Sequence, residues 1–170
     1  MFSELSVAAI AAAADRSVGV FYQRFGSKDD FLEVLLTAFF ERACAWAAEL
    51  DREVSASEMF TLNLNRSFEE LLSNRNLWQA ALQRSSAEPG YWARFADVGG
   101  RAAALGLAAI ERSAGRTLDE DERRRVALAR QVFNSVISNQ IINAPGPLRL
   151  EDPGFLPELR KIALQIAALD

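Results

Sequence analysis

The sequence contains no histidine and a single cysteine, and both shortages narrow the possible functions. Histidine is the commonest general base and a common metal ligand, so its absence removes the usual parts of hydrolase and zinc sites. One cysteine cannot form an internal disulfide, which is consistent with a reducing cytoplasm. No convergent base and nucleophile can be recognised in the sequence. We therefore expect no catalytic site, no metal site and no cofactor, and a protein that is not an enzyme.

β-Branched residues are sparse, and no stretch alternates between apolar and polar residues as a half-buried strand would. Hydrophobic residues make up 50% of the chain and charged residues 25%, as in ordinary globular proteins. No apolar run reaches the roughly 20 residues of a membrane-spanning helix, and no signal peptide opens the chain. The sequence therefore predicts an all-α, cytoplasmic protein without a membrane partner.

The net charge of −4 argues against nonspecific binding of nucleic acid by the whole surface. Its distribution is uneven. Residues 1–28 contain three basic and two acidic residues and so carry +1, whereas the remainder, with 16 basic and 21 acidic residues, carries −5. The asymmetry favours the N-terminal segment as the part that meets an anionic partner.

The most informative stretch predicts two short helices joined by a tight turn, followed by a much longer helix. Ser6 and Ser17 stand where their hydroxyl oxygens can cap the two short helices. Ser27 and Asp30 have the spacing of a capping box at the start of the long one. Two short helices in this arrangement form a helix-turn-helix.

The apolar residues of the two short helices fall on one side of each. Phe21 and Phe25 lie four residues apart and should anchor the second helix to a core. In the first helix, Val7, Ile10 and Ala14 have inward spacing. The opposite side of the second helix is small, polar or aromatic, and we expect it to lie against a partner.

The two segments read Ser6-Val-Ala-Ala-Ile-Ala-Ala-Ala-Ala and Ser17-x-Gly-x-Phe-Tyr-x-x-Phe-x-Ser-Lys. This pattern resembles the DNA-binding signature of TetR-family transcriptional regulators. The resemblance implies a partial three-helix DNA-binding domain over residues 1–30, followed by an all-helical effector-binding and dimerisation domain over residues 31–170. It also implies double-stranded operator DNA, a small-molecule effector and a second copy of the chain as partners. The predicted function is that of a ligand-responsive repressor.

In the family a further helix precedes this motif, and here only residues 1–5 stand before Ser6. We expect an upstream segment that belongs with the motif. Two alternatives stay open. A true loss would leave a dimeric ligand-binding module that does not bind DNA, and an incidental helix-turn-helix would leave a helical enzyme or ligand carrier.

The DNA contacts are expected on two sides of the motif. Resemblance to the family implies phosphate contacts from Tyr22, Lys28 and the two capping serines, while the outer side of the second helix can approach bases. Gln23 can pair with adenine through two hydrogen bonds, and Arg24 suits either role. The alternative is that Tyr22 covers the core and Lys28 is merely solvated. The predicted DNA-binding residues are Ser6, Ser17, Val18, Gly19, Val20, Tyr22, Gln23, Arg24 and Lys28.

Large aromatic residues recur between residues 28 and 115, with few charges expected to be buried among them. If they surround a pocket, its effector is apolar or aromatic. Each of them alone could equally be plain core. The candidate lining residues are Phe39, Phe40, Trp46, Phe60, Phe68, Trp78, Trp92 and Phe95.

Three features of the remaining helices bear on the fold. The long helix is predicted to run from Ser27 to about Glu53. A later helix is predicted to begin with a capping box formed by Thr117 and Glu120. Residues 99–100, both glycine, fall inside a helix and mark either a bend or close backbone approach, or a tolerated weak spot.

The last helix repeats its apolar residues at steps of four and three, like a coiled-coil seam. So apolar a helix needs a surface to cover it. Together with the preceding helix it predicts a two-fold, four-helix dimer interface, with packing inside one chain as the alternative. The predicted interface residues are Phe133, Ile137, Ile141, Phe155, Leu159, Ile162 and Ile166.

Overall fold

Only helices occur in the part of the chain that the computed structural model describes, residues 6–50 and 53–169. The all-α prediction is therefore confirmed. None of these helices combines the length and apolarity that a membrane crossing requires. In order, the elements are α1 (Val7–Ala13), α2 (Val18–Phe25), α3 (Lys28–Ala48), α4 (Ala56–Ser73), α5 (Arg75–Ala87), the 3₁₀ helix η1 (Tyr91–Phe95), α6 (Ala96–Ala114), α7 (Glu120–Asn143) and α8 (Phe155–Ala167).

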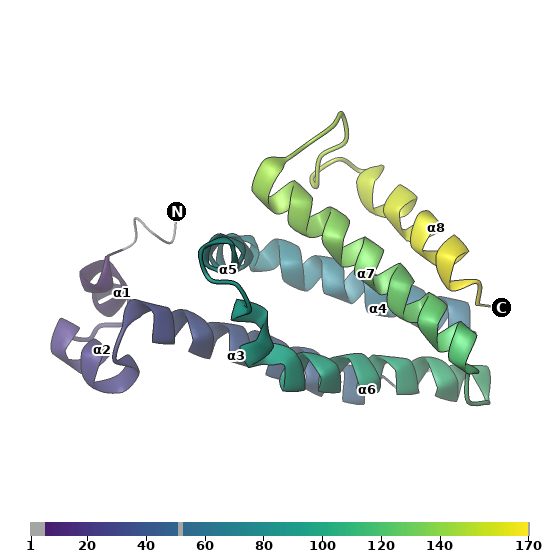
Figure 1. Cartoon of the computed structure of the whole chain (residues 1–170), viewed down its shortest axis with the longest axis horizontal. Coiled ribbons are helices and arrows are strands. Elements are labelled where there is room, and N and C mark those ends of the chain that lie inside the picture. The colour runs from purple at the N-terminus through teal and green to yellow at the C-terminus, as the bar shows by residue number, and fades with distance from the viewer. Residues whose placement is uncertain (1–5, 51–52, 170) are drawn as a thin grey trace.

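The small helices α1 and α2 project from one end of α3, and the other helices form the body (Figure 1). In the body α3 runs beside α6, α4 contacts α6 and α8, and α7 pairs with α8. The main core includes Phe60, Phe133 and Ile137, each of which is almost completely buried. Burying a side chain of this size stabilises the fold by about 1.5–3 kcal/mol. A second cluster, which includes Leu36 and Tyr91, joins the first half of α3 to α5 and η1.

The long helix α3 ends earlier than its sequence predicts. It stops at Ala48 rather than near Glu53, and residues 51–52 lie outside the described ranges. Leu50 is buried, and its carbonyl oxygen accepts a hydrogen bond of 2.9 Å from the Arg112 side chain on α6. Contacts with a helix distant in sequence therefore hold the chain where it leaves α3.

The predicted capping box of Thr117 and Glu120 is wrong, because the cap of α7 lies two residues further on. The Glu122 N–H donates to the Asp119 carboxylate at 2.8 Å, and the Asp119 N–H donates to the Glu122 carboxylate at 2.8 Å. Leu118 is buried in the core. Burial of this side chain places Asp119, rather than Thr117, at the point where the helix begins.

Glu122→Gln should lower stability in a pH-dependent way. The bidentate hydrogen bonds from Arg116 (2.7 and 2.6 Å), and then the N–H of Asp119, lower the pKa of Glu122 from 4.5 to about 2. The folded-state pKa is depressed, so this stabilisation is complete above pH 4.5 and disappears as the pH falls through about 2.

Thermal melts should therefore give Glu122→Gln a lower melting temperature than the wild type at pH 7, and the difference should shrink toward pH 2. Glu120→Gln is the control, because the Glu120 side chain is 90% exposed and its ion pair with Arg124 lies in solvent. An equal difference in melting temperature at pH 7 and at pH 2 would contradict the prediction.

Five of the seven predicted dimer-interface residues are buried inside the single chain, where α7 and α8 pack on each other and on α4. Ala163 and Ala167 take the inward positions on α8, because small side chains let the two helices approach closely. Ile162 is instead 47% exposed and Ile166 is half-buried. The residues removed from the predicted interface are Phe133, Ile137, Ile141, Phe155 and Leu159.

Residues 99–100 lie within α6 without any close contact that would require glycine. A Cβ on Gly99 would meet Phe40 at an ordinary 3.9 Å, and one on Gly100 would meet nothing within 4 Å. The close approach occurs instead at Gly106, where a Cβ would lie 3.1 Å from the Asn63 side-chain oxygen. The space around residues 99–100 therefore favours the weak-spot interpretation.

Candidate functional site

The helix-turn-helix forms as predicted, with a serine cap on each short helix. The Ser6 hydroxyl oxygen accepts a hydrogen bond from the N–H of Ala9 at 3.1 Å. The Ser17 hydroxyl oxygen accepts one from the N–H of Val20 at 3.3 Å. Asp15 adopts a left-handed conformation, with φ of 53°, in the turn between the helices. Local capping and turn geometry thus set the shape of this unit.

An aromatic cluster fastens α2 to α3. Phe21 is 4% exposed, and its ring lies 5.1 Å from Phe25 and 5.4 Å from Phe31 on α3. Such edge-to-face and tilted pairs stabilise beyond the area that they bury. The predicted anchor is confirmed. In α1 the inward position of Ala14 is wrong, because Ala14 is exposed and Ala11 is buried.

Two residues, Gly26 and Ser27, separate α2 from α3, and the chain turns at Gly26. Its φ of 74° is one that residues with a Cβ rarely adopt, and a Cβ there would lie 3.0 Å from the Asp30 carboxylate. Ser27 caps α3: its hydroxyl oxygen accepts the N–H of Asp30 at 3.0 Å, and the hydroxyl donates to the Asp30 carboxylate at 2.7 Å. The predicted pair therefore forms, with the carboxylate bonded to the serine side chain. The corner fixes the direction of α2 relative to α3.

The outer face of α2 is an exposed surface of apolar, polar and basic side chains. Val18 is 41% exposed, Val20 43% and Tyr22 51%. Three such side chains in solvent on one short helix indicate a surface that meets a partner. Lys28, the first residue of α3, is half-buried. The other predicted DNA-binding residues are exposed: Ser6, Ser17, Val18, Gly19, Val20, Tyr22, Gln23 and Arg24.

Two of these side chains also contact the aromatic cluster. The Tyr22 ring meets Phe21 edge-on at 5.6 Å, and the Arg24 guanidinium lies 5.7 Å from the centre of the Phe25 ring. Tyr22 therefore covers part of the core and remains half exposed, so its two interpretations are compatible. The contacts restrict how both side chains can be presented to a partner.

Ion pairs hold the first turns of α3 against the body. Arg84 on α5 lies 3.5 Å from the Asp29 carboxylate, and Arg94 on η1 lies 3.1 Å from that of Glu33. Beneath them the Tyr91 ring is buried, and burial, followed by the charge of Glu33, raises the pKa of its hydroxyl. The helix that carries the helix-turn-helix is thus attached to the body at its N-terminal end.

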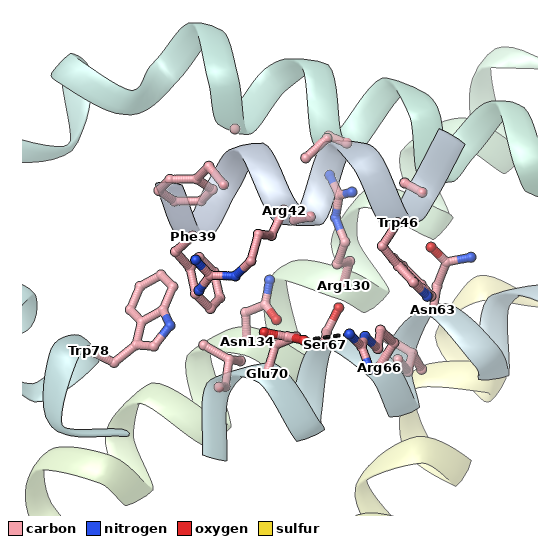
Figure 2. A pocket seen from close by; sticks show the side chains of 18 of the residues that line it. Phe39, Arg42, Trp46, Asn63, Arg66, Ser67, Glu70, Trp78, Arg130 and Asn134 are labelled. Atoms are coloured by element: carbon pink, nitrogen blue, oxygen red, sulfur yellow. Dashed lines mark ion pairs between the residues drawn. The ribbon is translucent and has the colours of Figure 1, made fainter. Parts of the chain in front are cut away.

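A second candidate site is a pocket of about 300 Å³ among α3, α4, α5, α6 and α7 (Figure 2). Three of the eight predicted lining residues lie elsewhere. Phe68 packs against Phe155 in the core, while Trp92 and Phe95 pack around Tyr91. The five that do line the pocket are Phe39, Phe40, Trp46, Phe60 and Trp78.

The pocket is more polar than its sequence predicts. On α7 the polar residues Arg130, Asn134 and Ser138 line it at steps of four, while Phe133 and Ile137 face the core. The repeat of polar residues at steps of four, beside the buried face of α7, was the signal in the sequence from which this side of the pocket could have been predicted. The polar lining residues are Arg42, Asn63, Arg66, Ser67, Glu70, Arg130, Asn134 and Ser138.

The described residues contain no group of histidine, cysteine, aspartate and glutamate side chains that could hold a metal ion. The polar chemistry of the pocket comes from guanidinium, amide and hydroxyl groups instead. These groups recognise a ligand through hydrogen bonds and charge.

Comparison with known families bears on the helix-turn-helix alone. The family model described as the N-terminal region of bacterial regulatory proteins, tetR family, matches residues 2–35. That range contains α1, α2, the Gly26 corner and the first turns of α3. Searches among curated proteins and among solved structures returned no match. Members of this family are regulators rather than enzymes. The matched helix-turn-helix, with its exposed α2 face, identifies residues 2–35 as a TetR-family N-terminal DNA-binding domain.

Proposed function

We propose that the protein is a dimeric repressor that a small effector releases from its operator. Residues 1–30 form the DNA-binding domain and residues 31–170 the effector-binding and dimerisation domain. The observation that carries the proposal is that α3 belongs to both sites. Its first residue, Lys28, adjoins the helix-turn-helix, and its second half, from Phe39 to Ala47, lines the pocket.

In this proposal α2 enters the major groove of the operator. Gly19, Val20 and Gln23 face the base edges, where Gln23 supplies hydrogen bonds and Val20 contacts a thymine methyl group. Tyr22 and Lys28 bind phosphates, as do the hydroxyls at the starts of α1 and α2, and these contacts fix the orientation of α2. The exposure of the outer face of α2 supports this arrangement.

The effector acts through the position of α3. The helix has 21 residues and is therefore about 30 Å long, so a small tilt at the pocket moves its far end appreciably. The ion pairs of Asp29 and Glu33 give that end a defined position on the body. Release requires that the effector bind the DNA-free arrangement more tightly than the DNA-bound one.

A dimer is supported by apolar side chains on the outer faces of α7 and α8. Leu128 is 51% exposed and Ile162 is 47% exposed. The Arg125 side chain lies 3.5 Å from the carbonyl oxygen of Ala167, so the two helices run antiparallel with Leu128 and Ile162 at similar heights. Two copies of this strip can bury each other about a two-fold axis, which suits a palindromic operator.

The test is a fluorescence anisotropy titration of the full chain on DNA from upstream of its own gene, at two salt concentrations. We expect tight binding that weakens steeply with salt, and release when an effector is added. Candidate small acids, amides and amines are first screened for binding by calorimetry. If a compound that saturates the pocket leaves operator affinity unchanged, the repressor mechanism fails.

A further inference from the structure

The pocket beside α3 has an excess of positive charge, although the whole chain carries −4. Its charged lining residues are Arg42, Arg66, Arg130 and Glu70, a net charge of +2. Arg66 is balanced by Glu70, whose carboxylate lies 2.7 Å away (Figure 2). Two guanidinium groups, those of Arg42 and Arg130, are left without a carboxylate partner among the described residues.

Arg130 is the more informative of the two. It is half-buried and points away from α7 into the space between the helices (Figure 2), and within the described ranges nothing pairs with it. Burial lowers the pKa of Arg130, with no acidic neighbour to raise it again. On the same helix Arg123 and Arg124 are paired with Glu111 and Glu120 at 2.8 and 3.0 Å. A desolvated cation that no residue neutralises gains most from an anionic ligand.

A second guanidinium of the lining, that of Arg42, is also available to a ligand, and the Trp78 ring adds aromatic surface to the wall. Arg42 is held over the Phe39 ring at 5.9 Å, a contact that orients the guanidinium but leaves its N–H groups available. These two guanidinium groups therefore favour a ligand that brings acceptors.

The aromatic part of the pocket wall indicates what the uncharged part of the ligand can be. Phe40, Trp46 and Phe60 contribute aromatic surface on the α3 and α4 sides. A pocket of about 300 Å³ has room for a ring system or a medium-length alkyl chain in addition to one charged group. The polar and the apolar parts of the wall thus define an amphipathic ligand.

We propose that this pocket binds an organic anion of medium size, whose carboxylate or similar oxyanion pairs with Arg130 while its aromatic or alkyl body packs against the ring-lined wall. Arg42 supplies further hydrogen bonds to the oxyanion or to acceptors near it. The inference deepens the proposed function, since it names the chemical class of the effector. It also predicts that cations of the same shape are rejected.

The test compares matched ligands by calorimetry on the full chain without DNA. The probes are naphthylacetate, naphthylacetamide and naphthylethylammonium, together with the hexanoate-to-decanoate series and the corresponding amides. We expect at least one acid to bind about ten- to hundredfold more tightly than its amide, because a charge-assisted hydrogen bond replaces a neutral one. The ammonium compound should not bind. If no acid of the panel binds more tightly than its amide, the proposal is overturned.

Variants locate the effect at Arg130. Arg130→Met should reduce the affinity for the acid by about ten- to hundredfold, to the level of the amide. Its affinity for the amide should stay within about twofold of the wild-type value. Arg130→Lys keeps the charge and should restore part of the preference. Arg124→Met, on the exposed side of α7, is the matched control and should change nothing, and circular dichroism checks that all three fold. An unchanged acid-to-amide ratio in Arg130→Met would refute the assignment.

The two proposals fail separately. Calorimetry without DNA tests the ligand class, whereas operator release tests the mechanism. A neutral compound that releases the operator while acids show no preference would refute the anion site alone. An acid that binds through Arg130 but does not release the operator would refute the effector mechanism alone.

Discussion

The double variant Tyr22→Phe, Lys28→Ala should bind its operator about a hundredfold more weakly and should still fold. Each substitution removes one donor to a phosphate, and a hydrogen bond to a charged group contributes about 1.5–3 kcal/mol. Phenylalanine keeps the ring that meets Phe21 at 5.6 Å, so the aromatic cluster is preserved. The main loss should therefore appear in DNA affinity, and circular dichroism should show the helical content of the wild type.

Anisotropy titrations over a range of salt concentrations measure this prediction. Because Lys28 is the cation removed, the slope of log affinity against log salt should fall by about 1. Arg124→Ala serves as the control, since Arg124 lies on α7 and its side chain is 70% exposed. Wild-type affinity in the double variant would show that Tyr22 only covers the core and that Lys28 makes no phosphate contact.

The variant Leu128→Glu, Ile162→Glu should be monomeric at concentrations where the wild type is a dimer. Both side chains are about half exposed on the outer faces of α7 and α8, and each change places a carboxylate in a self-complementary apolar contact. Four uncompensated charges about the two-fold axis should weaken association by at least a hundredfold. Operator affinity should fall by a similar factor, because one DNA-binding domain no longer holds the other near its half-site.

Sedimentation velocity and operator titration should change together in this variant. Val34→Glu is a matched control, because Val34 is 51% exposed on α3 and lies outside the proposed interface. Its dimerisation should be unchanged. A double variant that still sediments as a dimer would place the interface on another face.

The helix-turn-helix could be predicted in detail because the interactions that shape it are short in range. The bonds from Ser6 to Ala9, from Ser17 to Val20 and from Ser27 to Asp30 each span three residues. The Phe21 anchor needs a partner only ten residues away, at Phe31. Capping and helical spacing are visible in any window of that size.

The errors occurred where distant segments compete for the same residues. Arg112 donates a hydrogen bond to the Leu50 carbonyl oxygen, just beyond the point where α3 ends earlier than predicted. Burial of Leu118 moves the cap of α7 to Asp119. On α8 the predicted seam assigned Ile162 inward, yet Ala163 takes that place. Periodicity identifies a buried face to within about one residue, and the packing partner selects among the candidates.

The sequence alone determined the all-α class, the helix-turn-helix and the exposed face of α2, because these follow from composition, local capping and helical spacing. Only the tertiary structure decided which aromatics surround a pocket and which belong to the core. It also showed that the Arg130 guanidinium has no carboxylate partner within the described ranges, although Arg123 and Arg124 on the same helix have partners. Whether a charge is paired depends on which residues the other helices of the pocket bring to it, and no local pattern contains that information.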